Sequence, residues 1–124
     1  MKVVNQISEL QHLPIPPEIQ LQLHAHLTLP FNHNTTDAQE FWNDYPTQLA
    51  LVESSDTDAS IQTQNGEIHR LIHRAITTPE YVISMQANDA IFKLSLVCNG
   101  DDGAGFYLLI SATNTAFPMF QLTD

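Results

Sequence analysis

The sequence predicts a single α+β domain over residues 1–124, with an antiparallel β-sheet of four to six strands and one or two helices packed on one face. Three observations support this expectation. A length of 124 residues with 43% hydrophobic content suits one buried core. A stretch with helical spacing of apolar residues lies near the middle of the chain, and short apolar runs separated by turn residues follow it. A C-terminal meander of strands together with one or two helices favours the α+β class.

Residues 18–29 (EIQLQLHAHLTL) alternate apolar and polar side chains with a period of two. This alternation is typical of a half-buried strand, and Pro16, Pro17 and Pro30 mark its ends. A helix that begins at Pro17 is the alternative, because proline is favoured in the first helical turn and leucine, glutamine and alanine are good helix formers. We expect a strand.

A short helix and a further strand are predicted next. Thr36 and Gln39 have the spacing of a capping box, which predicts a helix over residues 37–44 that ends at Pro46. Residues 47–53 (TQLALVE) suit a strand. Residues 54–65 are rich in serine, aspartate and threonine, and we expect them to form an exposed loop.

The second half of the chain begins with a helix and continues as a strand meander. Apolar residues recur at the spacing of one helical stripe, namely Ile68, Leu71, Ile72, Ala75 and Ile76. Strands are expected over residues 81–86, 91–98, 106–112 and 116–122, with a glycine-rich turn at 99–105. The most apolar runs, 91–98 and 106–110, should be central, whereas Pro118 places the last strand at an edge.

Acidic residues dominate the charge of the chain. Four lysines and arginines stand against fourteen aspartates and glutamates, for a formal net charge of −10. Between Val3 and His69 there is no lysine or arginine. A field of this sign repels phosphate backbones and anionic membranes and attracts basic surfaces. We therefore expect a basic protein partner, with no direct binding to nucleic acid or membrane.

Recognisable catalytic and cofactor motifs are absent from the sequence. Neither phosphate-binding glycine spacing nor a Gly-x-Ser-x-Gly motif occurs. Cys98 ends an apolar run and is expected in the core, and a single cysteine excludes a disulfide within the chain. Neither an apolar signal segment nor a run of about 18 apolar residues is present. We expect a cytoplasmic protein that is not an enzyme and needs no cofactor.

Two pairs of histidines are candidate metal ligands. On a strand the side chains of His24 and His26 would point the same way and could bind one metal ion. This metal site is a weak alternative to the interpretation that both side chains simply face solvent. On a helix the two side chains would diverge. His69 and His73 have the i, i+4 spacing of metalloprotease histidines, but Arg70 stands where the catalytic glutamate would be. We expect that second pair to belong to a basic ridge that pairs with the acidic residues 56 and 58.

The strongest candidate binding surface lies between residues 37 and 58. Three carboxylates fall on one predicted helical stripe beside three aromatic residues, and three more carboxylates follow in the next segment. Aromatic anchors ringed by carboxylates suit a surface that docks on a basic partner. The alternative is a solvated helix whose aromatic residues pack inward. The candidate partner-binding residues are Asp37, Glu40, Phe41, Trp42, Asp44, Tyr45, Glu53, Asp56 and Asp58.

These observations predict a non-enzymatic acidic protein that inhibits a basic, nucleic-acid-binding partner. In its small size, acidity and lack of catalytic motifs the chain is similar in type to immunity proteins, antitoxins and the anti-defence proteins of phages and plasmids that act as nucleic-acid mimics. That likeness is one of style and carries no shared motif. Two alternatives stay open: a metal-binding module or metal-dependent enzyme built on His24 and His26, and a structural subunit of a larger assembly.

Overall fold

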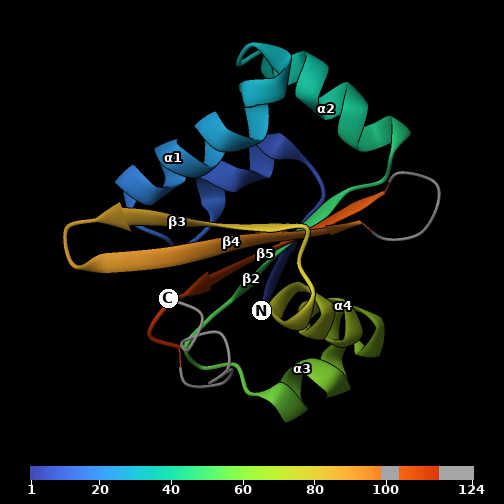
Figure 1. The fold of residues 1–124 in the computed structure, drawn as a ribbon, viewed down its shortest axis with the longest axis vertical. Coiled ribbons are helices and arrows are strands. Elements are labelled where there is room, and N and C mark those ends of the chain that lie inside the picture. The colour runs from blue at the N-terminus through green and yellow to red at the C-terminus, as the bar shows by residue number, and fades with distance from the viewer. Residues whose placement is uncertain (99–103, 115–124) are drawn as a thin grey trace.

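In the part of the chain that the structure describes, five strands form a mixed sheet in the order β1-β2-β5-β4-β3 (Figure 1). A computed structural model describes residues 1–98 and 104–114 of the chain. The strand bounds are β1 Lys2–Val4, β2 Gln48–Val52, β3 Tyr81–Ala87, β4 Ala90–Cys98 and β5 Gly105–Ser111. The predicted α+β class and strand number are confirmed, and so is the central place of the most apolar runs, because β5 is the middle strand and β4 lies beside it.

The sequence predicted a fully antiparallel sheet, and this was wrong: the sheet is mixed. β1 with β2, β5 with β4, and β4 with β3 pair antiparallel, but β2 and β5 run parallel over the full length of β2. A parallel pair needs a long connection. Here that connection holds two helices and the β3–β4 hairpin before the chain returns beside β2. Nothing in the local sequence of either strand marks this pairing.

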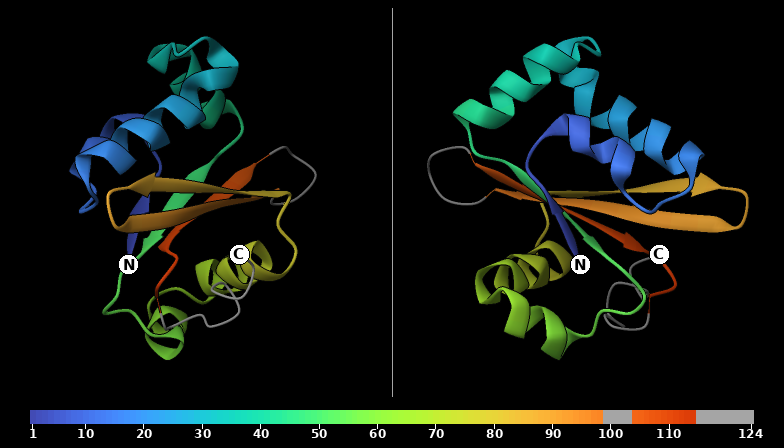
Figure 2. Two further views of the ribbon diagram at one scale, coloured as in Figure 1. Left: turned by 60° about the vertical axis from the view of Figure 1, so that its left-hand side comes forward. Right: turned by 180° about the vertical axis from the view of Figure 1, so that it is seen from behind.

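Helices cover both faces of the sheet, whereas the sequence predicted one or two on a single face. One face carries α1 (Pro17–Thr28) and α2 (Thr35–Asp44), with the 3-10 turns η1 (Ile7–His12) and η2 (Leu29–Phe31). The other face carries α3 (Asp58–Gln64) and α4 (Gly66–Thr77) (Figure 1, Figure 2). Among the residues that the structure describes, no helix has the length and apolarity to cross a membrane.

The two layers of helices give the protein two hydrophobic cores, one on each side of the sheet. Alternate residues of β2 and β5 enter each core: Leu49 and Leu109 pack beneath α1 and α2, while Ala50 and Leu108 pack against α3 and α4. All four are 0% exposed. A strand buried on both faces loses its polar alternation, which explains the continuous apolar runs LALV and FYLLI.

The predicted strand 18–29 is helical instead: residues 18–28 belong to helix α1, and Leu29 begins η2. Pro17 occupies the first helical turn, as in the alternative interpretation. Ile19, Leu23 and Leu27 follow one another at intervals of four and are 0–3% exposed, whereas Leu21 is 72% exposed. The alternating pattern was misleading because leucine also occupies the solvent side of the helix. Packing on β3 and η1 selects the helical stripe.

Most of the other predicted elements are confirmed. The structure contains α2, β2, α4 and the β3–β4–β5 meander close to their predicted bounds. Four elements of the described residues were missed: β1, the 3-10 turns η1 and η2, and helix α3 inside the predicted loop 54–65, where Thr57 and Ser60 form a capping box. Helix α2 is capped by Asn34 instead of Thr36. Most of the predicted turn 99–105 and the whole predicted strand 116–122 lie outside the described residues.

The helical form of α1 can be checked by truncating two of its leucines separately. We expect Leu23→Ala to lower the free energy of unfolding by about 3 kcal/mol, because it leaves a cavity in the core. Leu21→Ala should change it by less than about 0.5 kcal/mol, because that side chain is in solvent. Urea denaturation measures both. Equal losses in the two variants would contradict the helix, since on a strand both leucines share one face.

Candidate functional site

Helix α2 presents opposite faces to the core and to solvent. Ala38 and Trp42, one helical turn apart, are buried against the sheet. The Asn34 side chain accepts a hydrogen bond from the backbone N–H of residue 37 and fixes the start of the helix. The outward stripe, called the α2 surface below, therefore consists of five exposed residues from the predicted set: Asp37, Glu40, Phe41, Asp44 and Tyr45.

Two aromatic rings stand exposed on the α2 surface. Phe41 and Tyr45 are each 43% exposed, and their ring centroids lie 4.8 Å apart. Phe31 of η2 continues the row at 5.5 Å from Phe41. Tilted rings at these separations stabilise one another. The exposed aromatic pair of the α2 surface thus continues in a row with Phe31, and exposed aromatic side chains of this kind are typical of a protein-binding site.

An apolar groove of about 400 Å³ opens beside this aromatic row. Leu27, Phe31 and Phe41 line it from the helical layer, and Leu96 and Tyr107 line it from the sheet. Cys98 also lines the groove and is exposed, although the sequence predicted it to be in the core. The groove has the size and the apolar lining of a site for one or two large side chains of a partner.

The three carboxylates of the α2 surface are in solvent. Asp37, Glu40 and Asp44 are exposed, and within residues 1–98 and 104–114 none of them forms an ion pair with a basic group. Their negative charge is therefore not neutralised locally and adds to the field of a chain with net charge −10.

Trp42, a predicted contact residue, is a core residue instead. It is 4% exposed, and its ring stacks on Tyr107 of β5 with the centroids 6.0 Å apart and the planes inclined by 15°. Burial raises the pKa of the Tyr107 hydroxyl well above its usual range, and the neighbouring Tyr81 adds to this effect. Trp42 shapes the floor of the groove and holds α2 on the sheet.

Two other predicted contact residues lie at the opposite end of β2 from α2. Asp56 is 6% exposed; it accepts a hydrogen bond from the backbone N–H of Glu53 and pairs with the amino group of Met1 at 2.7 Å. Glu53 lies 3.7 Å from the same amino group. The carboxylates between residues 37 and 58 thus do not share one face, and Asp56 stabilises the fold.

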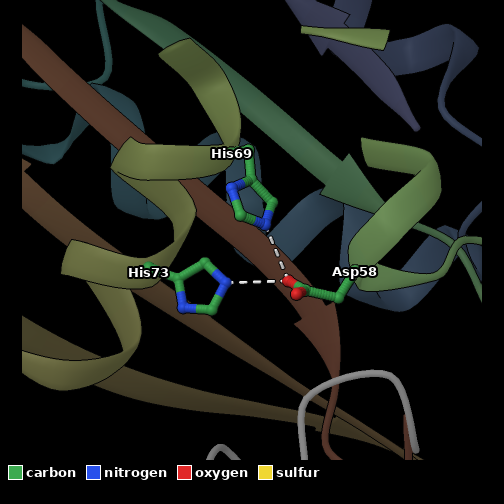
Figure 3. Close-up of side chains that lie close together, drawn as sticks. All are labelled: Asp58, His69 and His73. Atoms are coloured by element: carbon green, nitrogen blue, oxygen red, sulfur yellow. Dashed lines mark hydrogen bonds and ion pairs between the residues drawn. The ribbon is translucent and has the colours of Figure 1, made fainter. Parts of the chain in front are cut away.

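Asp58, the ninth predicted contact residue, forms a cluster with two histidines of α4 (Figure 3). The Nε2 atoms of His69 and His73 lie 2.8 and 2.7 Å from the same oxygen, Asp58 Oδ1. The hydrogen bond from His73 is the main cause that lowers the pKa of the Asp58 carboxyl; burial opposes it, and the hydrogen bond from His69 lowers the pKa further. The predicted pairing of the second histidine pair with the acidic segment is therefore present for Asp58.

His24 and His26 do not form a shared site, because both lie on helix α1. Residues two apart on a helix point in divergent directions. The Nε2 atom of His24 lies 3.2 Å from Thr35 Oγ1, and that of His26 lies 3.1 Å from the hydroxyl of Tyr81 on β3. Burial lowers the pKa of His26. The weak metal alternative on this pair is not supported by its geometry.

Comparison of the chain with models of protein families, with curated protein sequences and with solved structures found no match. The site is therefore interpreted from its own residues.

Sequence reasoning located the exposed stripe of α2 but missed the groove. The groove is lined from α1, η2, α2, β4 and β5, and no local pattern brings segments this far apart together. The i, i+4 spacing of His69 and His73 was a usable signal. The pairing of these histidines with the acidic residues 56 and 58 was also predicted, but the sequence placed Asp58 in an exposed loop, whereas the structure places it in helix α3.

The buried position of Asp56 predicts a large effect on stability. Asp56→Ala removes the acceptor of the Glu53 N–H and the nearer partner of the Met1 amino group, which keeps the more distant Glu53 at 3.7 Å, so we expect a loss of about 3 kcal/mol in the free energy of unfolding. The exposed Asp44→Ala is the matched control and should cost less than about 0.5 kcal/mol. Chemical denaturation of both variants is the measurement, and an equal loss would contradict a structural role for Asp56.

The lowered pKa of His26 predicts a pH dependence of stability. Its folded pKa lies below the ordinary value of 6.5, so the unfolded chain takes up this proton first and the wild type loses stability as the pH falls below that value. His26→Gln removes this loss. We therefore expect the wild type to lose more stability than the variant between about pH 7.5 and about pH 5. Parallel curves for the two proteins over this range would exclude the effect.

Proposed function

We propose that this chain is a non-enzymatic acidic binding protein that inhibits a basic, nucleic-acid-binding protein. The single observation that supports it is the α2 surface, where an exposed aromatic pair stands at the edge of an apolar groove beside three carboxylates in solvent. Immunity proteins, antitoxins and phage or plasmid anti-defence proteins are the types of inhibitor that it is proposed to join.

The proposed mechanism has two stages, and charge acts in the first. A chain with net charge −10 attracts a basic surface over a distance of about 8 to 10 Å at physiological salt, which raises the rate of encounter. The same field disfavours phosphate backbones. The proposed partner is therefore a basic protein, and not the nucleic acid to which that partner binds.

Apolar contact acts in the second stage and supplies most of the affinity. An aromatic or long aliphatic side chain of the partner enters the groove and packs on Phe41. Arginines or lysines around that anchor meet Asp37, Glu40 and Asp44. An apolar centre within a charged rim is the arrangement of energetically important protein contacts. The bound chain then covers the phosphate-binding groups of the partner, so the partner can no longer bind nucleic acid.

We keep the cytoplasm as the proposed compartment. The single cysteine cannot form a disulfide within the chain, so the fold does not depend on an oxidising environment. The proposal assigns no catalytic residue and no cofactor.

The occupant of the groove can be tested with random peptides selected on the immobilised full chain. We expect the selected peptides to carry lysines or arginines around one aromatic or aliphatic residue. Their affinity, measured by fluorescence anisotropy, should fall steeply as salt rises, since charge contributes to binding. Selection of acidic or uncharged peptides, or affinity that does not change with salt, would overturn the proposal.

Two sets of variants assign the binding to the α2 surface. We expect Phe41→Ala to weaken binding of a selected peptide by at least about tenfold, because the anchor loses its contact. The double variant Glu40→Lys, Asp44→Lys should weaken it and flatten the salt dependence. Lysine at position 44 suits the carboxyl end of the helix, so the fold should tolerate it.

The matched control for charge is Glu67→Lys, Asp89→Lys, which changes the net charge by the same amount at exposed positions in α4 and the β3–β4 turn. Binding should persist in this control. If both double variants lose affinity alike, only the overall charge matters and the α2 surface is not the site.

The alternative that the chain is a structural subunit of a larger assembly stays a prediction. Light scattering tests it, because a closed homo-oligomer would show a mass that is a multiple of the mass of one chain.

A further inference from the structure

The cluster of Asp58, His69 and His73 (Figure 3) lies on α3 and α4, the helices on the opposite face of the sheet from α2 (Figure 1). Its three side chains come from two helices, and their possible ligand atoms all lie within 4.8 Å of one another. We propose that these three residues bind one divalent cation of the zinc class, which ties α3 to α4. The proposal is independent of the function proposed above.

Both helices are fixed where they carry the ligands. The capping box of Thr57 and Ser60 sets the first turn of α3, so Asp58 is its first residue. The side chain of Asn65 caps α4 by accepting a hydrogen bond from Ile68 N–H. The apolar stripe of α4 is buried against the sheet and determines the rotation of that helix. A metal site gains precision when rigid elements hold its ligands.

Residues four apart lie on one side of a helix, so α4 turns both histidines toward the start of α3. Their ring centroids are 4.6 Å apart, and each ring directs Nε2 at Asp58 Oδ1 (Figure 3). In a tetrahedral zinc site, ligand atoms about 2.1 Å from the ion are about 3.4 Å from one another. The present contacts of 2.7 and 2.8 Å need to open by roughly 0.6 to 0.7 Å to admit the ion.

The donor set suits zinc better than calcium or magnesium. Two imidazoles and one carboxylate are ligands of zinc and its neighbours, whereas calcium and magnesium prefer oxygen alone. A carboxylate only accepts hydrogen bonds, so without a metal each Nε2 must carry the hydrogen that faces Asp58. When the metal binds, each neutral imidazole holds its hydrogen on Nδ1 and offers the Nε2 lone pair. Asp58 is 52% exposed, which leaves room for water as a fourth ligand.

Two arginines on α4, Arg70 and Arg74, follow His69 and His73 in sequence, and their positive charges would repel a cation if they faced the site. Neighbouring residues on a helix point about 100° apart. Arg70 pairs with Glu67 at 3.5 Å, and Arg74 donates a hydrogen bond to the carbonyl of Cys98 at 3.1 Å. Both guanidinium groups are thus directed to other partners, and the acidity of the chain as a whole favours a cation.

Zinc chloride titrated into the chelator-treated full chain, followed by calorimetry, tests the site. We expect one zinc per chain, and Asp58→Asn and His73→Gln should each weaken binding by at least about tenfold, the lower limit for disturbing even an outer partner of a metal site. His12→Gln and His24→Gln are the controls and should bind as the wild type does. A fold check by circular dichroism accompanies each variant.

Two measurements on the wild type keep the proposal testable if a variant unfolds. Zinc should shift the imidazole resonances of His69 and His73 alone among the six histidines, and saturating zinc should raise Tm by on the order of 10 °C. Cobalt should give the visible absorption of a tetrahedral site. Absence of stoichiometric binding, shifts at other histidines only, or full binding by Asp58→Asn would overturn the assignment.

Discussion

The parallel pairing of β2 with β5 is the constraint on which the rest of the structure depends. Both strands are apolar on both sides, so each face of the sheet needs a covering layer of helices. The chain supplies α1 and α2 before β2, and α3 and α4 after it. The double burial of this pair therefore explains why the molecule has two cores.

The same pairing separates the two candidate sites. Helix α2 precedes β2 and connects to the first residue of this strand. The segment that leads to α3 begins at the other end of β2. The helices before and after β2 also lie on opposite faces of the sheet (Figure 2). The α2 surface and the Asp58 cluster are thus independent in position, although fewer than fifteen residues separate Asp44 from Asp58 in the sequence.

Within α2, one helix serves both the core and the surface. Trp42 stacks on Tyr107 and fixes the helix against the sheet, and this leaves Phe41 and Tyr45 on the outside. Three aromatic residues close together in sequence therefore have different roles. The burial of Trp42 holds the exposed pair in place beside the groove, so that a partner would meet a surface that is already ordered.

The sequence by itself determined what local periodicity and composition encode. It placed α2, α4 and the strands from β3 to β5, and it established the acidic character and the exposed stripe of α2. Tertiary structure alone decided the remainder. Packing on β3 made residues 18–29 a helix, the parallel β2–β5 pairing gave the sheet its mixed topology, and burial removed Trp42 and Asp56 from the predicted surface. The reason is physical: the pattern of apolar and polar residues along the chain determines which residues share a face of an element. Contacts between segments distant in sequence decide whether that face packs in the core or lies in solvent.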